Sequence, residues 1–117
     1  MTSPSAPSGP NPKRGDVYWV NLDPTIGAEI KKTRPCAVLS LSALNERRRT
    51  VVVVPLSSGG TPRPPLVVAI PSVGPGHTAR IDQIRVVDKA RLSNQLGRLD
   101  RQDLAIIENA LRTVLGL

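Results

Sequence analysis

The chain has 117 residues, with 16 lysines and arginines against nine aspartates and glutamates, which gives a formal net charge of +7 at pH 7. This length suits one compact domain, because two separate cores would each be marginal. The single cysteine, Cys36, excludes an internal disulfide, and one cysteine with one histidine cannot build a zinc site. The longest apolar run, residues 51–56, is too short to span a bilayer. We therefore expect a protein without metal or cofactor.

The excess of positive charge predicts an anionic partner, of which nucleic acid is the commonest. Tyr18 and Trp19 are the only aromatic residues, so a sheet that stacks several bases on aromatic rings cannot be built. We expect bound nucleic acid to be held mainly by cations and hydrogen bonds. A surface charge that serves solubility alone is the alternative.

Residues 1–12 contain four of the twelve prolines, three serines and no charged side chain, which predicts a flexible or extended tail. They lack the basic leader and apolar stretch of a secretory signal, so we expect a cytoplasmic protein. The folded domain is expected over residues 13–117.

Short segments rich in β-branched and aromatic residues predict strands at residues 17–22, 35–40, 50–56, 66–70 and 78–87. Four consecutive valines in residues 50–56 are typical of a strand covered on both faces. Residues 78–87 alternate between apolar and charged side chains, which predicts one long, half-exposed strand. Residues 42–45 are expected to form a single helical turn, and residues 92–99 fit no pattern clearly.

A helix is predicted after Asp100, an N-cap candidate, and Asp103 suits its positive end. Gly116 marks its end. Its apolar face is expected to comprise Leu104, Ile107, Leu111, Val114 and Leu115. Five or six strands with polar connections and one terminal helix indicate a mostly-β, α+β fold, a small antiparallel barrel with the helix packed across it.

Three groups of side chains could carry chemistry. Glu29 and Arg34 lie five residues apart in a loop between strands, and Arg80 and Asp82 would project to one side of a strand. Residues 57–58, two serines, follow the valine-rich strand, where a barrel displays functional groups. Surface ion pairs and ordinary turn serines are the simpler interpretations.

Two further features have equally simple interpretations. His77, between a glycine and a threonine, is typical of a solvated loop histidine. The three arginines at residues 47–49 suit a solvated turn or a general phosphate contact. These residues alone support nucleic-acid binding and leave the reaction open.

An ordered set of segments resembles a known family. Residues 14–29, RGDVYWVNLDPTIGAE, lead into residues 32–40, KTRPCAVLS, and the two resemble the opening of the MazF/PemK toxins. Further similar segments are VVPLSS at residues 53–58, DQIRVVDKARL at residues 82–92 and the closing residues 110–117. The resemblance covers about residues 13–117.

The resemblance implies a small SH3-like antiparallel barrel of the MazF/PemK/CcdB type with a C-terminal helix. It implies a homodimer that cleaves single-stranded RNA at a short sequence without a metal, and a small antitoxin whose acidic tail covers the RNA groove. The CcdB gyrase toxins share this fold but lack the Gly-x-Glu and Arg-Pro loop that residues 27–35 carry.

The family's most characteristic catalytic pair falls on Arg34 and Ser57, where serine replaces the usual threonine and keeps its hydroxyl. Glu29 matches an acidic position with a base role in some members, and Arg80 and Asp82 match acid and base positions in others. Where some relatives have histidine before the glutamate, this chain has alanine. The neighbouring residues expected to contact RNA are Lys31, Lys32, Ser58 and Arg85.

Without a metal, the feasible reaction is attack by the RNA 2′-hydroxyl on the adjacent phosphorus, which leaves a 2′,3′-cyclic phosphate. Arg34 can grip two phosphate oxygens, Ser57 can donate to a third, and Glu29 or Asp82 can act as the base. Arginine is a poor acid, so charge stabilisation is its expected role. The alternatives are a non-catalytic nucleic-acid-binding barrel and a gyrase-directed toxin.

Overall fold

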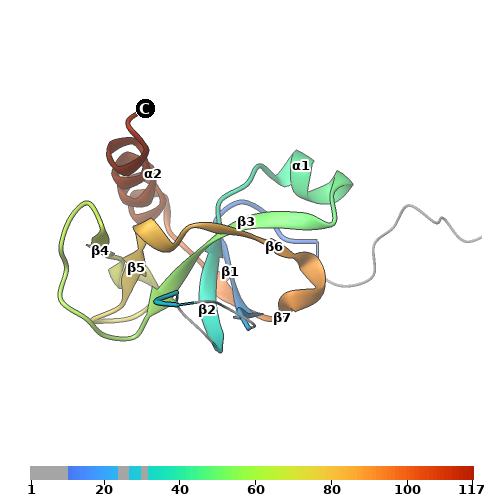
Figure 1. Ribbon diagram of the computed structural model, residues 1–117, viewed down its shortest axis with the longest axis horizontal. Coiled ribbons are helices and arrows are strands. Elements are labelled where there is room, and N and C mark those ends of the chain that lie inside the picture. The colour runs from blue at the N-terminus through green and yellow to red at the C-terminus, as the bar shows by residue number, and fades with distance from the viewer. Residues whose placement is uncertain (1–10, 24–26, 30–31) are drawn as a thin grey trace, which may run out of the picture.

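The computed structural model describes residues 11–23, 27–29 and 32–117 (Figure 1). In the described part, seven strands precede a long helix that follows them in the chain. The strands are β1 (Asp16–Asn21), β2 (Thr33–Val38), β3 (Thr50–Ser57), β4 (Val67–Ala69), β5 (Thr78–Arg80), β6 (Arg85–Asp88) and β7 (Leu92–Arg98). The helices are α1 (Ser42–Arg47), α2 (Arg101–Leu115) and the 3-10 turns η1 (Pro71–Val73), η2 (Ile81–Gln83) and η3 (Lys89–Arg91).

The strands form one antiparallel sheet in the order β4-β5-β3-β2-β1-β7, with β6 also paired to β3. β3 lies at the centre: β2 pairs along one side, while β5 and β6 pair with successive parts of the other side. The sheet curves without closing between β4 and β7. The mostly-β, α+β class expected from the sequence is therefore confirmed, with seven strands in place of five or six.

Both faces of β3 are covered, as its valine run predicts. On one face Val54 and Leu56 belong to a cluster completed by Ile107 and Ala110 of α2. On the other face Val51 and Val53 belong to a second apolar cluster. The other members of this second cluster are Tyr18, Val20, Leu22, Cys36, Val38, Val87 and Leu92. Because side chains alternate along a strand, β3 is the element shared by the two cores.

The ends of α2 form as predicted. The Asp100 carboxylate accepts a hydrogen bond from the Asp103 amide at 2.8 Å, which satisfies a free donor of the first turn. Gly116 takes a left-handed conformation (φ +73°), and its amide donates to the carbonyls of the last turn. Leu115 is the exception to the predicted apolar face, because it is 54% exposed.

The prediction of one strand over residues 78–87 is wrong. Its first part, β5, pairs with β4 and with the end of β3, and its last part, β6, pairs with the beginning of β3. The 3-10 turn η2 joins the two parts and buries Ile81 in the core. The segment must break because β5 and β6 pair with different parts of β3. The alternation of side chains within the segment does not indicate these two pairings.

Two segments are longer or clearer than expected. The turn predicted at residues 42–45 is the six-residue helix α1, and all but the last of the unassigned residues 92–99 form β7. Asn45 of α1 is buried and donates to the carbonyl of Pro12 at 3.0 Å. The tail predicted for residues 1–12 lies mostly outside the described residues and stays a prediction. No helix in the described part of the chain is long and apolar enough to cross a membrane.

Candidate active site

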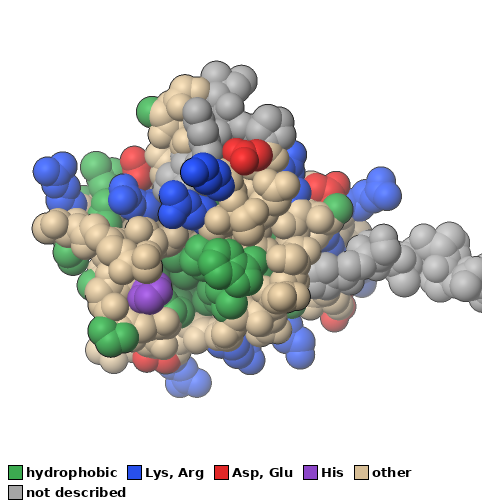
Figure 2. Space-filling view, turned by 90° about the horizontal axis from the view of Figure 1, so that it is seen from below, with side chains coloured by type: hydrophobic (Ala, Val, Ile, Leu, Met, Phe, Trp, Pro, Cys, Tyr) green, Lys and Arg blue, Asp and Glu red, His purple; other side chains and the backbone are tan. Residues whose placement is uncertain are grey.

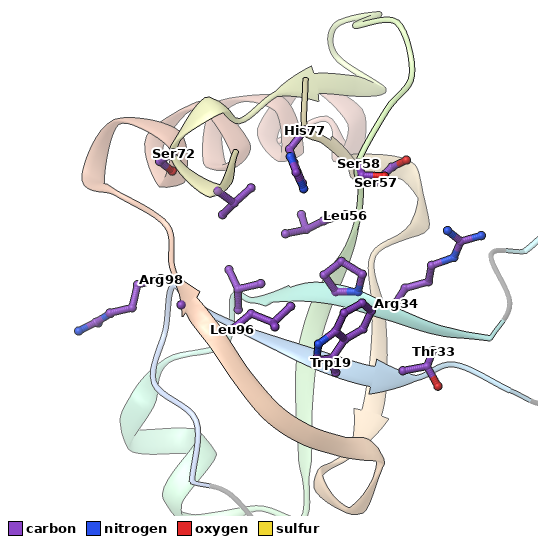
Figure 3. A pocket seen from close by; sticks show the side chains of 14 residues that line it. Trp19, Thr33, Arg34, Leu56, Ser57, Ser58, Ser72, His77, Leu96 and Arg98 are labelled. Carbon is purple, nitrogen blue, oxygen red and sulfur yellow. The ribbon is translucent and has the colours of Figure 1, made fainter. Parts of the chain in front are cut away.

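A hollow of about 470 Å³ opens where β1, β2 and β3 meet β7 and the segment before β5 (Figure 3). Trp19 and Pro35 lie directly opposite each other across the β1–β2 pair and form part of its floor. Trp19 is 37% exposed and Leu96, on the edge strand β7, is 49% exposed. The residues that line the hollow are Val17, Trp19, Thr33, Arg34, Pro35, Leu56, Ser57, Ser58, Ser72, Val73, His77, Leu96, Gly97 and Arg98.

Arg34 and Ser57 both lie at the rim of this hollow. Cys36 pairs with Pro55 across β2 and β3, so continuing the antiparallel register by two residues sets Arg34 opposite Ser57. Arg34 is exposed, and in Figure 3 its side chain extends from β2 away from the indole of Trp19. The Ser57 hydroxyl oxygen accepts a hydrogen bond from the Gly59 amide at 3.3 Å, which leaves its proton available for donation.

Arg34, Ser57 and Arg85 project to the side of the sheet opposite to the hollow's floor. Arg34 is two residues from Cys36, and Arg85 is two residues from Val87, and both Cys36 and Val87 belong to the second core. Trp19, Pro35 and Leu56 project into the hollow instead. The rim is thus a narrow border between a cationic side and an apolar side. Figure 2 shows this arrangement as Lys and Arg side chains gathered beside an apolar patch.

Glu29 reaches this cationic side. Its Oε2 lies 3.9 Å from Nη1 of Arg85, which begins β6. Burial raises the pKa of the neighbouring Cys36 thiol to about 12, and the positive charge of Arg85 opposes that rise. Cys36 is free and fully buried, so it takes no part in the surface chemistry.

The structure separates Arg80 from Asp82. Arg80 ends β5 and is half-buried; its Nε is buried without a hydrogen-bond partner among the described residues, and a Cβ at Gly60 would lie 3.6 Å from its Nη2. Asp82 is exposed in the η2 turn. The expectation that both project from one strand to one side is therefore wrong, because the strand ends at Arg80. Arg80 remains near Ser57, since Ser57 pairs with Thr78 on β5.

The remaining predicted contacts are spread around the rim. Lys31 lies outside the described residues. Lys32 is exposed and has a positive φ of 70°, and its amide donates to Asp23 at 2.9 Å. Ser58 is exposed on the wall of the hollow, while Arg85 is half-buried. Residues 47–49 are exposed at the α1–β3 turn and do not line the hollow.

The sequence interpretation missed the hollow itself. Trp19 and Leu96 are two exposed apolar residues from distant parts of the chain, and only the β1–β7 pairing brings their strands together. His77, interpreted as a solvated loop residue, is half-buried and its ring lies in the hollow (Figure 3). In the sequence, the only feature that bears on the hollow is that Trp19 is the single tryptophan of the chain, and its exposure is known only from the structure.

No group of three or more His, Cys, Asp or Glu side chains within the described ranges could hold a metal ion. The chemical groups that the rim offers are guanidinium groups, a hydroxyl and a carboxylate. Such a set can bind a phosphodiester, stabilise added negative charge on it and accept a proton beside it.

Comparison with known proteins identifies the family of the chain. The chain is 36% identical over 108 residues to the endoribonuclease PemK of Escherichia coli, covering 88% of this chain and 81% of PemK. The structure resembles MazF of Deinococcus radiodurans with a TM-score of 0.81 at 29% identity, covering 91% and 97% of the two chains.

A mycobacterial endoribonuclease in complex with its cognate antitoxin matches with a TM-score of 0.73 at 30% identity, covering 92% of this chain and 95% of that one. These similarities confirm the resemblance that the sequence carries. The model of the PemK-like, MazF-like toxins of type II toxin–antitoxin systems matches residues 13–115, and the chain belongs to this family.

Proposed function

We propose that the chain is the toxin of a toxin–antitoxin pair and an endoribonuclease that cuts single-stranded RNA at a short sequence. Membership of the family supports the toxin role, and the relatives named as endoribonucleases support the reaction class. One observation supports the proposal at the level of residues: Arg34 and Ser57 both line the hollow, each two residues beyond the last β2–β3 pair, Cys36 and Pro55. A phosphodiester at this rim meets both side chains.

The reaction is attack by the 2′-hydroxyl of one nucleotide on the adjacent phosphorus. The bond from phosphorus to the 5′-oxygen of the next nucleotide breaks, and that oxygen takes a proton from water. Arg34 holds two phosphate oxygens, which suits the planar fork of a guanidinium. Ser57 donates its proton to a non-bridging oxygen, because its own oxygen already accepts from Gly59. Arg80, whose Nε has no partner within the described fold, stabilises the developing phosphorane charge.

The base is assigned to Glu29. Its carboxylate lies on the cationic side through its ion pair with Arg85, whereas Asp82 is exposed in a turn beyond the end of β5. A carboxylate beside two phosphate-binding arginines weakens RNA binding, so its presence at this place favours a chemical task for it. Removal of the 2′-hydroxyl proton is that task. The product carries a 2′,3′-cyclic phosphate, and DNA, which lacks the attacking hydroxyl, is not cut.

Two partners complete the proposal. A mycobacterial relative is seen with its cognate antitoxin, and we expect this chain to bind a MazE/PemI-like antitoxin whose acidic tail covers Arg34, Arg80 and Arg85. Charge complementarity with a net +7 protein favours such a tail. A homodimer, a metal-independent reaction and a cytoplasmic location are further parts of the proposal.

The test is incubation of the purified protein with mixed-sequence single-stranded RNA and with matched DNA, in excess chelator, followed by analysis of the product ends. Cleavage of RNA alone with a cyclic phosphate end supports the proposal. The Arg34→Ala variant should lose at least about a hundredfold in kcat while RNA binding falls only a fewfold. Arg63→Ala, at an exposed position off the rim, is the matched control and should cut normally.

Intact RNA across many sequences would overturn the endoribonuclease. Bound but uncut RNA would indicate a non-catalytic binding barrel, and inhibition of gyrase without RNA cleavage would indicate a topoisomerase-directed toxin. Equal losses of binding and cleavage in the Arg34→Ala variant would indicate that Arg34 only binds the phosphate. The family match and the paired arginines and carboxylate at the rim favour the enzyme over both alternatives.

A further inference from the structure

Arg91 is an arginine to which the proposed reaction gives no role. It ends η3, and the next residue, Leu92, begins β7 and pairs with Val20 of β1. Arg91 is half-buried and is not among the residues that line the hollow. The β1–β7 pairing therefore places this arginine beside the end of β1, where the chain leaves the sheet on its way to Glu29.

The Arg91 guanidinium bridges two main-chain carbonyls at this point. Its Nη1 donates a hydrogen bond to the carbonyl of Asn21 at 3.1 Å and another to the carbonyl of Asp23. Hydrogen bonds from a charged donor are stronger than those between neutral groups. Arg91 thereby fixes the main chain on both sides of Leu22.

Further hydrogen bonds join the two ends of the connection between β1 and β2. The Asp23 carboxylate accepts from the Lys32 amide at 2.9 Å, and the Lys32 carbonyl accepts from the Leu22 amide at 2.9 Å. Lys32 has a φ of 70°, which a lysine seldom adopts and which surrounding contacts must hold. We call this group of four residues the neck of the connection: Asn21, Leu22, Asp23 and Lys32.

The neck determines how two residues of the proposed site lie relative to each other. Glu29 lies three residues before Lys32, within the connection, and Arg34 lies two residues after it, on β2. The Glu29 carboxylate is 3.9 Å from Arg85, which begins β6, and Arg91 follows the end of β6 by three residues. One continuous segment, residues 85–91, therefore contacts the connection twice, at Glu29 and at the neck.

We propose that Arg91 is a positioning residue of the active site, because its bonds to the carbonyls of Asn21 and Asp23 fix the neck from which the chain carries Glu29 to the cationic side. Arg91 contacts neither the RNA nor the reacting atoms. This inference rests on the proposed endoribonuclease function and adds a residue remote from the phosphate to it. Displacement of a catalytic group by about 1 Å costs about a hundredfold in rate. Loss of the Arg91 bonds therefore lowers kcat and leaves phosphate binding by Arg34 in place.

The first experiment separates kcat from KM. Arg91→Ala should lower kcat by about tenfold or more on the RNA sequence that the wild type cuts, with KM changed less than about threefold. Arg91→Lys keeps the charge and a donor without the planar fork, and it should restore part of the rate. The control is Arg112→Ala, which removes the same charge at an exposed position of α2 and should match the wild type.

Urea unfolding first shows that each variant is folded under the assay conditions. A folded Arg91→Ala variant with the kcat of the wild type would overturn the proposal. A higher KM with unchanged kcat would make Arg91 an RNA contact and would overturn it too. If Arg91→Ala does not fold, Arg91→Lys takes its place, and the same two outcomes decide.

The second experiment asks whether Arg91 acts through Glu29. Single-turnover rates are measured for Arg91→Ala, for Glu29→Gln and for the double variant. Removal of the carboxylate leaves nothing for the neck to position, so Arg91→Ala should lower the rate of Glu29→Gln by less than about threefold. Losses that multiply would show that the two residues act independently and would overturn the proposal.

The third experiment measures the neck without any RNA. Amide hydrogen exchange of Leu22 and Lys32, followed by NMR, should be at least about fivefold faster in Arg91→Ala, while the amide of Asp103 in α2 exchanges as in the wild type. Asp23→Ala should have the same effect, whereas Asp23→Asn, which keeps an oxygen acceptor, should have a smaller one. Unchanged exchange in Arg91→Ala would contradict its hold on the neck.

Failure of this inference can be told apart from failure of the proposed function. If the wild type cuts no RNA, the proposed function fails and the role of Arg91 in it fails as well. If the wild type cuts RNA and folded Arg91→Ala cuts it equally fast, only the role of Arg91 is overturned. If Glu29→Gln cuts as fast as the wild type, the assignment of the base is wrong and Arg91 has no base to position.

Discussion

The main-chain amide and the hydroxyl of Ser72 both donate hydrogen bonds to the carboxylate of Asp103, with the amide nitrogen 2.8 Å from Oδ2. Asp103 is buried in the first turn of α2, and its own amide donates to the Asp100 carboxylate. Ser72 belongs to η1 and lines the hollow. One buried carboxylate thus connects the long helix to the wall of the hollow.

Removal of this connection should lower stability. Asp103→Ala leaves the Ser72 amide and hydroxyl without their acceptor, and we expect the free energy of unfolding to fall by about 1–3 kcal/mol. Ser72→Ala removes the hydroxyl alone and should cost less. Urea unfolding followed by circular dichroism measures both. Midpoints equal to that of the wild type would show that the Ser72–Asp103 bonds are not needed for the fold.

The Ser57 hydroxyl should control the rate. Ser57→Ala removes one donor to the phosphate, and the loss of such a donor costs about 10²–10³-fold in kcat. Ser57→Thr adds only a methyl group at a half-buried position and should retain most of the activity. Single-turnover cleavage of the identified RNA sequence gives both rates. A Ser57→Ala variant as fast as the wild type would remove Ser57 from the mechanism.

The two carboxylates should differ. Glu29→Gln removes the assigned base and should lower kcat by at least about a hundredfold, whereas Asp82→Asn, an exchange in an exposed turn, should lower it less than about fivefold. Both variants reduce the negative charge by one, so each is the electrostatic control for the other. Cleavage rates measured at saturating RNA show which of the two carboxylates acts as the base. The reverse order would transfer the role of base to Asp82.

Buried Cys36 should make the protein less stable in alkaline solution. Burial raises the pKa of its thiol from 9.0 to about 12, so above pH 9 the unfolded chain releases a proton that the folded chain retains. Stability therefore decreases as pH rises through this range, by about 1.4 kcal/mol per pH unit for this group. Burial and the charge of Asp16 also raise the pKa of Tyr18, which adds to the decrease at higher pH.

Unfolding by urea at several values between about pH 8 and pH 10 measures this slope, and Cys36→Ala provides the comparison because it keeps Tyr18. The variant should be less stable throughout and should show the smaller dependence on pH. Parallel curves for the two proteins would contradict the assignment. Native protein should also resist thiol alkylation until it is unfolded.

Lys89 offers a substitution expected to stabilise the fold. Its side chain is 1% exposed, and its Nζ has no hydrogen-bond partner among the described residues. Burial of an unpaired ammonium costs free energy, so Lys89→Met should raise the free energy of unfolding by about 1 kcal/mol or more. Lys13→Met, at an exposed position, should change it by less than about 0.5 kcal/mol. A destabilised Lys89→Met would show that the ammonium has a partner that the fold requires.

The elements with a local pattern were predictable from the sequence. The valines of β3, the spacing of the apolar residues of α2 and its caps at Asp100 and Gly116 depend on neighbours in the chain, and these predictions are confirmed. The break between β5 and β6 was not predictable in this way, because it follows from pairing with two distant parts of β3. β7 was ambiguous for the same reason, since its partner is the first strand.

The residues of the candidate site can be separated in the same way, into those that the sequence indicates and those that depend on distant parts of the chain. Arg34 and Ser57 could be named because they match the catalytic pair of the family that the sequence resembles. In the structure each lies two residues beyond the last β2–β3 pair, Cys36 and Pro55, and both line the hollow. The hollow could not be named, because its floor joins Trp19 from the first strand with Leu96 from the last. No periodicity in the chain marks such a contact. His77 lacked any sign of its packing against Gly74, since two residues three apart in a glycine-rich turn carry no register.

The sharing of β3 between two cores has a consequence for the order of events during synthesis. Ser57 ends this strand, and the cluster that covers one of its faces includes Ile107 and Ala110 of α2. The ribosome produces β3 well before α2, so a growing chain exposes the apolar residues of that face until the helix emerges. The core beneath the rim is therefore complete only after α2 has been synthesised, and a chain that stops before α2 leaves part of this apolar face without its cover.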